Sequence, residues 1–543
     1  ARRVLPLPLI LAIIAPAMTS VADEARPPAV VETTSGSPRP TADPPRPTTR
    51  PAATRPDSMD TAKDDAPLDR PLARPSAAMV FAPEPPVIDG RLDEAIWDDA
   101  ARIDAFTQVN PIEGAPPSFR TEVLLLFDRE HLYIGARCLD PAPDDIRAFE
   151  MQRDGNLGSD DRISFVIDTF YDRRNAFFFQ MNPVGARVDA LIEDNSRFRK
   201  EWDGIWTGKA GINAEGWTVE IALPFKTISF NPNSARWGFN ASRTVRRLNE
   251  DVRWAAPVRD KSFNSIADAG TLEGFADLEQ GLGLDVVPFV TGGFRHNEDE
   301  DTFPLDAGLD AFYKITPALT AAFTVNTDFA ETEVDERRIN LTRFPLFFPE
   351  KRDFFLQDAG IFNFGGINRN PLPFFSRRIG FGPDGRPRDI LAGVKVTGRV
   401  NDLNLGALNV QMKDDPELGS KNYTVLRPSI NVLEESNLGA IFTYGDPSRP
   451  EDGGLGGLDF RYRNSDFAGS GRVVDGSLWV QQADNPGAEG GESAFGFKLG
   501  YPNDRIRWQV GASQIDEEFD APLGFVPRPG IREYFANWRY RWR

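Results

Sequence analysis

The chain has 543 residues, and its 62 basic and 81 acidic side chains give a formal net charge of −19. This length predicts two or more domains, and the acidic balance argues against nucleic acid as a partner, because a surface that binds nucleic acid must be cationic. Hydrophobic residues make up 40% of the chain and charged residues 26%, which excludes global disorder.

The first 22 residues have the three parts of a secretory signal peptide. Arg2 and Arg3 form a basic start, residues 5–17 form an apolar core, and Ser20-Val21-Ala22 supplies small residues for cleavage. The apolar core is too short to span a bilayer as a helix. We therefore expect an exported protein whose mature form begins near Asp23, with a buried N-terminal strand or helix as the alternative.

Residues 23–78 are rich in Pro, Ala, Thr, Arg and Asp and show no apolar period. Such a segment cannot bury enough apolar surface to offset the conformational entropy lost on ordering. We therefore predict a disordered linker.

Short apolar or alternating runs separated by turn residues follow in residues 79–280. They predict one helical turn within 93–101 and strands at 123–127, 132–136, 163–167, 176–181 and 217–223. Many short strands at regular spacing are typical of an antiparallel β-sandwich. Cys138, the only cysteine, lies in a strand-like run and is predicted to fill the core.

Apolar and polar side chains alternate throughout residues 281–543. Apolar side chains occupy every second position in the segments 309–315, 319–325, 390–396, 438–444, 495–501 and 534–542. A transmembrane strand needs ~9–11 residues with alternate side chains toward lipid, and Tyr and Trp at strand ends suit the membrane interface. The pattern predicts an antiparallel transmembrane β-barrel, while periodicity alone leaves a second soluble sandwich or a propeller open.

Residues 79–280 resemble the family 9 carbohydrate-binding modules. The resemblance rests on Val87-Ile88-Asp89-Gly90 followed by Trp97, on the aspartate-bounded strand 161–168, on 216–226, on Trp237-Gly238-Phe239-Asn240 and on Gly270-Thr271-Leu272. It implies a β-sandwich that binds a glycan.

Residues 281–543 resemble a family of outer-membrane proteins of unknown function that carry this module at their N-terminus. The matching pieces are 326–329, 340–344, 347–356 and Gly524-Phe525-Val526-Pro527-Arg528. The resemblance implies an outer-membrane location with outer-membrane lipid as a partner, and it places the module in the periplasm. About a dozen candidate strands are fewer than a complete member implies, so we expect a C-terminally truncated barrel. The charged run Glu350-Lys351-Arg352 is predicted to face the lumen or an interface.

The resemblance also implies where a sugar would bind. In sugar-binding family 9 modules two tryptophans sandwich the ring, and the corresponding positions here are Gly158 and Phe263. Because one aromatic ring is missing, we predict weak binding that uses Phe263, the loop residues Trp202 and Trp206 as an exposed platform, and Asn240 as a polar partner.

Asp154, Asp160 and Asp161 cluster near a predicted turn. Carboxylates of this kind suit calcium, which takes oxygen ligands in a flexible shell, while ordinary turn and capping chemistry is the alternative. No other cofactor is predicted, and two histidines are too few for a His-based metal site.

Three functions follow from these observations. The first is a non-catalytic module on an outer-membrane barrel that docks or takes up a glycan. The second is an envelope assembly or structural barrel with the module as a periplasmic plug or partner surface. The third is glycan processing by hydrolysis of O-glycosyl bonds, for which no catalytic residue can be named because no G-x-S-x-G, H-E-x-x-H or Walker motif occurs.

Overall fold

The computed structural model describes residues 74–542 apart from 196, 297–300, 304, 327–342, 349 and 385. The predicted signal peptide lies outside the described residues, as does the predicted linker up to residue 73. Among the described residues, no helix is both long enough and apolar enough to cross a membrane.

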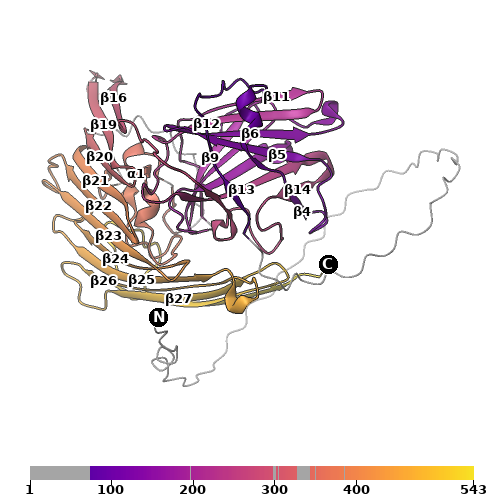
Figure 1. The fold of residues 1–543 in the computed structure, drawn as a ribbon. Coiled ribbons are helices and arrows are strands. Elements are labelled where there is room, and N and C mark those ends of the chain that lie inside the picture. Colours follow the sequence, from indigo (N-terminus) through magenta and orange to yellow (C-terminus); the bar gives the residue numbers. More distant parts are fainter. Residues whose placement is uncertain are drawn as a thin grey trace, which may run out of the picture. The chain divides into compact units, whose positions relative to one another are not determined.

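Residues 76–273, called the module below, form two sheets packed face to face (Figure 1). The first sheet contains, in spatial order, β1 (Ser76–Ala78), β15 (Gly270–Glu273), β13 (Arg236–Val245), β7 (Arg162–Asp168), β8 (Ala176–Met181), β9 (Arg187–Glu193) and β10 (Arg197–Arg199), with β14 (Glu250–Arg253) and β4 (Thr107–Asn110) attached to β13. The second contains β11 (Thr207–Asn213), β12 (Gly216–Pro224), β6 (His131–Leu139), β5 (Thr121–Phe127) and β2 (Val80–Phe81), with β3 (Ala101–Ile103) also on β5. All pairs are antiparallel except β1–β15 and β2–β5, and β1 places ordered structure before the predicted boundary at residue 79.

The apolar runs of the sequence form the core between these two sheets. Each of the five predicted strands is present, and the predicted helical turn is the short 3-10 helix η1 (Ala95–Asp98). Trp217, Trp237 and Cys138 are almost completely buried in this core. Four further 3-10 turns complete the module: η2 (Pro143–Asp145), η3 (Leu157–Ser159), η4 (Arg246–Leu248) and η5 (Ile266–Asp268).

Glu220 joins the two ends of the family 9 motif. Its carboxylate accepts hydrogen bonds from the backbone N–H groups of Asp89 (2.9 Å) and Gly90 (2.8 Å) and from Nε1 of Trp97 (3.0 Å). Burial raises the pKa of Glu220 to about 7, although the three donors act in the opposite direction. Glu220 of β12 therefore holds the segment around Asp89 and Gly90 and the ring of Trp97 against the module's second sheet.

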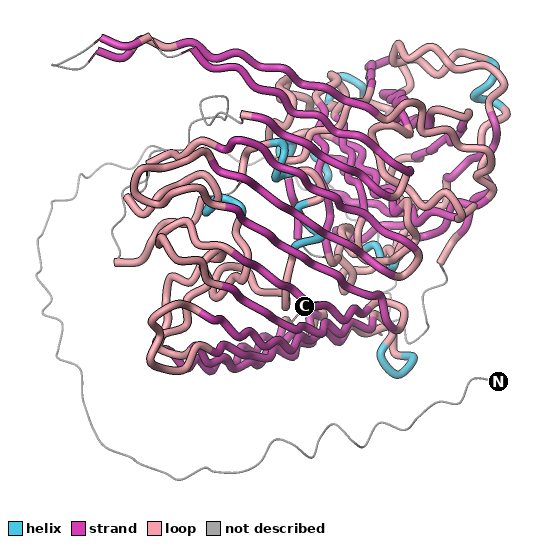
Figure 2. Tube along the Cα trace, turned by 90° about the vertical axis from the view of Figure 1, so that its left-hand side faces the viewer, coloured by secondary structure: helices cyan, strands magenta, loops and turns pink. Residues whose placement is uncertain are grey.

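Twelve antiparallel strands form a second structure, called the large sheet below (Figure 2). Each strand of this sheet pairs with the strand of the sheet that follows it in the chain. They are β16 (Leu284–Gly292), β19 (Leu305–Thr316), β20 (Leu319–Val325), β21 (Ile390–Val400), β22 (Leu403–Met412), β23 (Asn422–Val432), β24 (Ser436–Tyr444), β25 (Gly454–Asn464), β26 (Val474–Asp484), β27 (Ser493–Pro502), β28 (Ile506–Ile515) and β29 (Ile531–Tyr540). A small hairpin, β17 (Arg295–His296) with β18 (Asp301–Thr302), lies between β16 and β19 in the chain. Within the described residues β16 and β29 are not paired with each other, so the antiparallel prediction is confirmed while the sheet seen here is open.

The two faces of the large sheet differ in character. On β24, Leu438, Phe442 and Tyr444 are each 46–49% exposed, whereas the alternate residues Ile441 and Thr443 are at most 2% exposed. Neighbouring strands repeat this alternation. The face with exposed apolar side chains is called the outer face below, and the buried one the inner face.

Residues 343–389, called the inner segment below, cover part of the inner face. The segment contains the helix α1 (Asp353–Leu356) and the 3-10 turns η6 (Ala359–Phe362) and η7 (Ser376–Arg378), and the turn η8 (Phe467–Gly469) lies between β25 and β26. Phe354 and Phe355 of α1 pack with apolar residues of β22 and β23. In the charged run, Glu350 binds Arg352 at 2.7 Å, and both side chains are buried in this segment. Burial alone would raise the pKa of Glu350, but Arg352 outweighs it and holds that pKa at about 2.

Three pieces of the outer-membrane resemblance meet at the inner segment. The ring of Phe525 lies 5.4 Å from the rings of both Phe347 and Phe375, and Arg528 lies over Phe344 at 5.0 Å. Residues separated by more than 150 positions thus form one aromatic cluster. These motifs therefore have a packing role.

Polar contacts hold the module against the inner face of the large sheet. Arg399 of β21 binds Asp172 at 2.8 Å, Nη1 of Arg174 donates to Oδ1 of Asn431 of β23 at 2.8 Å, and Asp260 pairs with Arg472. Basic side chains of the large sheet therefore meet carboxylates of the module in several of these contacts.

Candidate functional site: a cavity between module and large sheet

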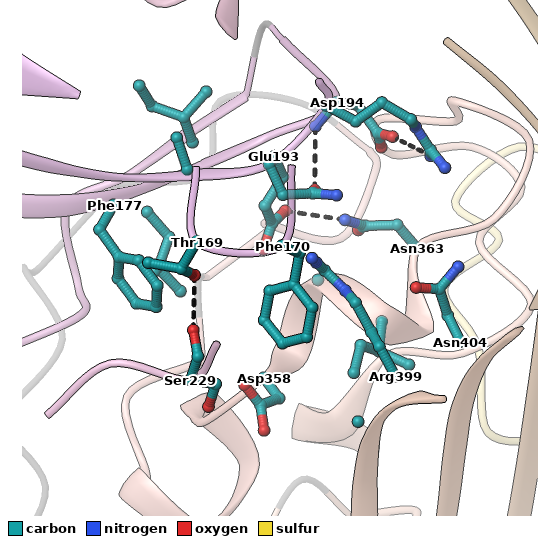
Figure 3. A pocket seen from close by; sticks show the side chains of 18 of the residues that line it. Thr169, Phe170, Phe177, Glu193, Asp194, Ser229, Asp358, Asn363, Arg399 and Asn404 are labelled. Atoms are coloured by element: carbon teal, nitrogen blue, oxygen red, sulfur yellow. Dashed lines mark hydrogen bonds and ion pairs between the residues drawn. The ribbon is translucent and has the colours of Figure 1, made fainter. Parts of the chain in front are cut away.

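A cavity of about 130 Å³ lies where the module, the inner segment and the inner face of the large sheet meet (Figure 3). The module contributes residues 169–177, 191–194 and 227–229 together with Trp202. The inner segment contributes residues from 357 to 363, and the large sheet contributes side chains of β19 to β25. No single stretch of the sequence could have disclosed this convergence.

Asp194 is the charged centre of one wall. It lies at the turn between β9 and β10, where Asp194 and Asn195 both have positive φ (52° and 59°). Its carboxylate binds Arg174 of the module at 2.5 Å and also binds Arg461 of β25. Burial on its own would raise the pKa of Asp194, but Arg461 and Arg174 outweigh it and hold that pKa far below its usual range.

The neighbouring carboxylate, Glu193, ties the module to the inner segment. It accepts a hydrogen bond from Nδ2 of Asn363 at 2.7 Å and binds Arg199 at 3.2 Å (Figure 3). Arg197 also donates to Asn363. The β9–β10 turn therefore contacts both other parts of the cavity wall.

Aromatic rings form another part of the lining. Trp202 lies 5.2 Å from the ring of Phe177 and 6.2 Å from that of Phe179. On the opposite side, Arg399 lies over the ring of Phe170 at 4.4 Å. The cavity therefore combines apolar ring surface with polar groups, the usual composition of a small-molecule site.

The predicted ligand residues do not come together in one place. Trp202 is partly buried and lines the cavity, and its role as a platform for a sugar stays a prediction. Trp206 is only 4% exposed and packs on Phe179 inside the core, so the expectation that it is part of an exposed platform is wrong. The apolar packing of the loop around it was not evident from its polar flanking residues.

The side chain of Asn240 is buried and joins β13 to the loop that follows β14. Its Nδ2 donates to the carbonyl of Ala255 at 3.0 Å, and its Oδ1 accepts from the backbone N–H of Ala255 at 2.9 Å. These bonds occupy the amide with the module's own backbone. Ligand binding by Asn240 remains a prediction that this geometry does not favour.

Phe263 packs against an apolar cluster on the outer side of the module's first sheet and lies 6.4 Å from Phe178. The loop that carries it is bound to the large sheet. Nζ of Lys261 donates to the carbonyl of Ser465 at 2.6 Å, and Arg463 donates to Oγ of Ser265 at 3.0 Å. The predicted sandwich position therefore lies close to the docked sheet.

The predicted calcium residues separate into two groups. Asp160 accepts three hydrogen bonds, from the N–H groups of Phe149 and Glu150 and from Asn182, and Asp161 accepts one from the N–H of Arg246. Both carboxylates therefore accept hydrogen bonds from backbone N–H groups, which agrees with turn and capping chemistry, the alternative to calcium binding.

Asp154 instead lies in a group of carboxylates with Asp189 and Asp203, whose oxygens come within 4.8 Å of one another. Arg153 already binds all three, at 3.4, 2.9 and 3.1 Å. Burial raises the pKa of Asp189 to about 6 in spite of this arginine. The guanidinium supplies the positive charge that a cation would otherwise bring.

One part of the chain matches a family model. Residues 281–412 match a domain of unknown function, DUF5916. No curated protein matches the chain.

Among solved structures, a family 9 carbohydrate-binding module from Caldicellulosiruptor kristjanssonii is similar in its complex with glucose (16% identity, 37% of this chain and 97% of that one, TM-score 0.27) and in its complex with cellotriose (17%, 37% and 95%, 0.27). A proposed carbohydrate-binding protein from Bacteroides uniformis is similar at 13% identity over 37% of this chain and 99% of its own, with a TM-score of 0.31. Function has to be argued from this chain's own contacts, because these values are low.

Proposed function

We propose that this chain is a non-catalytic outer-membrane protein whose large sheet contacts lipid through its outer face, while the carbohydrate-module-like domain lies on the periplasmic side and docks a glycan. The observation that carries the proposal is the contrast between the two faces of the large sheet. The outer face exposes large apolar side chains, whereas buried charged side chains such as Lys395, Arg427 and Asp459 lie on the inner face together with buried apolar ones. This arrangement is typical of sheets whose outer face contacts lipid.

The size of the apolar face supports contact with lipid. The outer face includes Phe323, Leu426, Ile430, Leu438, Phe442, Leu458, Leu478, Val480, Phe495 and Phe497, each more than a third exposed. If each leaves roughly half of its apolar surface uncovered, the face presents on the order of 1,000 Å², beyond the few hundred Å² that soluble monomers usually expose.

Site-directed fluorescence in lipid tests the membrane proposal. Cys138, the only native cysteine, is completely buried, so an introduced cysteine can be labelled selectively. We expect a fluorophore on Phe442→Cys to be quenched by brominated lipid in vesicles and protected from aqueous iodide. Ile212→Cys, at a similarly exposed position of the module, is the matched control and should show the reverse. Equal iodide quenching at both positions would refute the lipid assignment.

One observation favours the second function, a plug or partner surface. The loop of Phe263 is bound to the large sheet through Lys261 and Ser265, so the module's predicted sugar position is close to the protein's own sheet. Calorimetric titration of the full chain in lipid nanodiscs with cello-, xylo- and malto-oligosaccharides separates the two functions. Millimolar or tighter binding supports glycan docking, and no heat with any of them favours the plug.

A further inference from the structure

We propose that the cavity between the module and the large sheet binds a single neutral sugar ring, or an uncharged polyol of that size, at a site distinct from the Phe263 position. This inference rests on the proposed glycan-docking function and names a place and a ligand class for it.

The charged groups around the cavity are bound by the protein itself. Arg174 and Arg461 bind Asp194, Arg399 binds Asp172, and Arg427 binds Asp459. Glu193 binds Arg199, Nζ of Lys314 donates to the carbonyls of Lys226 and Ile228, and Asp358 accepts from Oγ1 of Thr397. A ligand with a net charge would have to compete with these contacts, whereas a neutral ligand would not.

Uncharged hydrogen-bonding groups of β22, β23 and β24 also line the cavity. Asn404 donates to Oγ of Ser429 (3.4 Å) and to Oδ1 of Asn431 (3.1 Å), and Asn431 lies opposite Asn437 in the register of β23 and β24. Asn437 is only 6% exposed, and its Oδ1 has no hydrogen-bond partner among the described residues. A buried acceptor without a partner is costly, and a ligand hydroxyl in the cavity would satisfy it.

The module side supplies ring surface opposite these amides. Trp202 and Phe177 line the cavity from the module, and Phe170 lines it beside Arg399. Apolar ring faces next to neutral amides and hydroxyls match a pyranose, which has apolar C–H faces and a rim of hydroxyls.

Size restricts the ligand further. The cavity of about 130 Å³ approaches the roughly 150 Å³ that accommodates one benzene ring in an engineered protein cavity. One ring therefore fills most of it, and the further units of an oligosaccharide would have to extend beyond it. We therefore expect monosaccharides to bind better than their oligomers.

Titration of the full chain in nanodiscs with glucose, galactose, xylose and myo-inositol, with glucuronate and cellotriose as comparison ligands, tests the inference. We expect at least one neutral monosaccharide to bind, and glucuronate and cellotriose to bind at least tenfold more weakly. Asn437→Ala and Trp202→Ala should each weaken binding about tenfold. Asn409→Ala is the matched control, because Asn409 lies on β22, the strand of the lining residue Asn404, but is not part of the lining.

A second readout does not depend on whether a variant folds. In the unmodified protein, the bound sugar should slow hydrogen exchange in residues 169–177 and 357–363. Absence of binding by every neutral monosaccharide, equal binding of glucuronate, or full binding by well-folded Asn437→Ala and Trp202→Ala proteins would each overturn the inference. If the Phe442 fluorophore is in lipid and no monosaccharide binds, the inference fails while the membrane proposal stands.

Discussion

The module and the large sheet are both antiparallel β structures, yet they differ in what their faces bury and expose. In the module, Trp217, Trp237 and Phe239 lie in the core between two sheets. In the large sheet, Leu438 and Phe442 point outward, and Arg427, Asp459 and Lys395 lie on the inner face with at most 2% exposure. The same period of two residues thus serves two environments, and only the location of the polar partners distinguishes them.

Removing a charge from the inner face should have the largest effect. Asp459 binds Arg427 at 2.7 Å and accepts from the N–H of Gly365 at 2.9 Å. Asp459→Ala leaves Arg427 buried without its partner, and we expect a loss of about 3–5 kcal/mol in the free energy of unfolding. Urea unfolding in lipid vesicles, followed by tryptophan fluorescence, measures it.

The double variant Arg427→Met/Asp459→Leu is the control for this prediction. It removes both charges together, so it should lose much less stability than Asp459→Ala. If the single variant loses under about 1 kcal/mol, the inner face does not depend on internal charge pairing in the way that its contacts indicate.

A charge introduced on the outer face of the large sheet tests whether that face contacts lipid. Phe442→Arg places a guanidinium on the outer face of β24, two residues from the middle of the strand, and we expect a loss of up to about 2–4 kcal/mol in a bilayer. Ile212→Arg at a similarly exposed position of the module should change stability by under about 0.5 kcal/mol. Equal losses of stability at the two positions would mean that Phe442 and Ile212 are both exposed to water.

The sequence predicted much of this arrangement because alternation and turn residues are local signals. The strands at 123–127 and 217–223 and the apolar positions Leu438 and Phe442 were all assigned from neighbouring residues alone. Glu350-Lys351-Arg352 is predicted to face the lumen or an interface, and Glu350 and Arg352 form an ion pair in the inner segment.

The candidate site could not be predicted in the same way. Trp206 has polar neighbours in the chain, but its ring packs on Phe179 of a different strand. The cavity needs Trp202 and Asn437, which are 235 positions apart, and sequence periodicity carries no information about such pairs. Arg153, which satisfies Asp189 and Asp203, was missed for the same reason.

A pH titration probes the module alone. The pKa of Glu220 is about 7 in the folded protein, raised above its usual value by burial. A raised carboxyl pKa means that the folded state binds the proton more tightly, so stability is greatest below about pH 4 and declines as pH rises toward 7. The decline relative to Glu220→Gln should be at most about 3 kcal/mol.

Thermal unfolding of the full chain and of Glu220→Gln at pH 4, 5, 6 and 7 measures this difference. Other groups titrate in both proteins, so the difference in stability between the two proteins is compared from one pH to the next. A constant difference from pH 4 to 7 would mean that the three N–H donors around Glu220 keep its pKa at the ordinary value.

The contact between the module and the large sheet should depend on pH in the opposite sense to the stability contributed by Glu220. Its expected effect is the smallest of these predictions. Arg461 and Arg174 hold the pKa of Asp194 far below its usual range despite burial. A depressed carboxyl pKa gives stability that is present above the unfolded value, about 3.9, and is lost only as pH falls through the lower folded value. Docking should therefore persist unchanged from pH 7 to pH 4.

Asp194→Asn should weaken the docking of the module on the large sheet by about 1.5–3 kcal/mol, because hydrogen bonds to a charged group are replaced by neutral ones. Hydrogen exchange of residues 197–199, corrected for the intrinsic rate, should then become roughly 10- to 150-fold faster. Glu215→Gln, at an exposed turn of the module, is the control and should leave this exchange unaltered. If wild-type exchange already accelerates near pH 5, Asp194 titrates in its ordinary range and the arginines of the sheet do not hold the module in place.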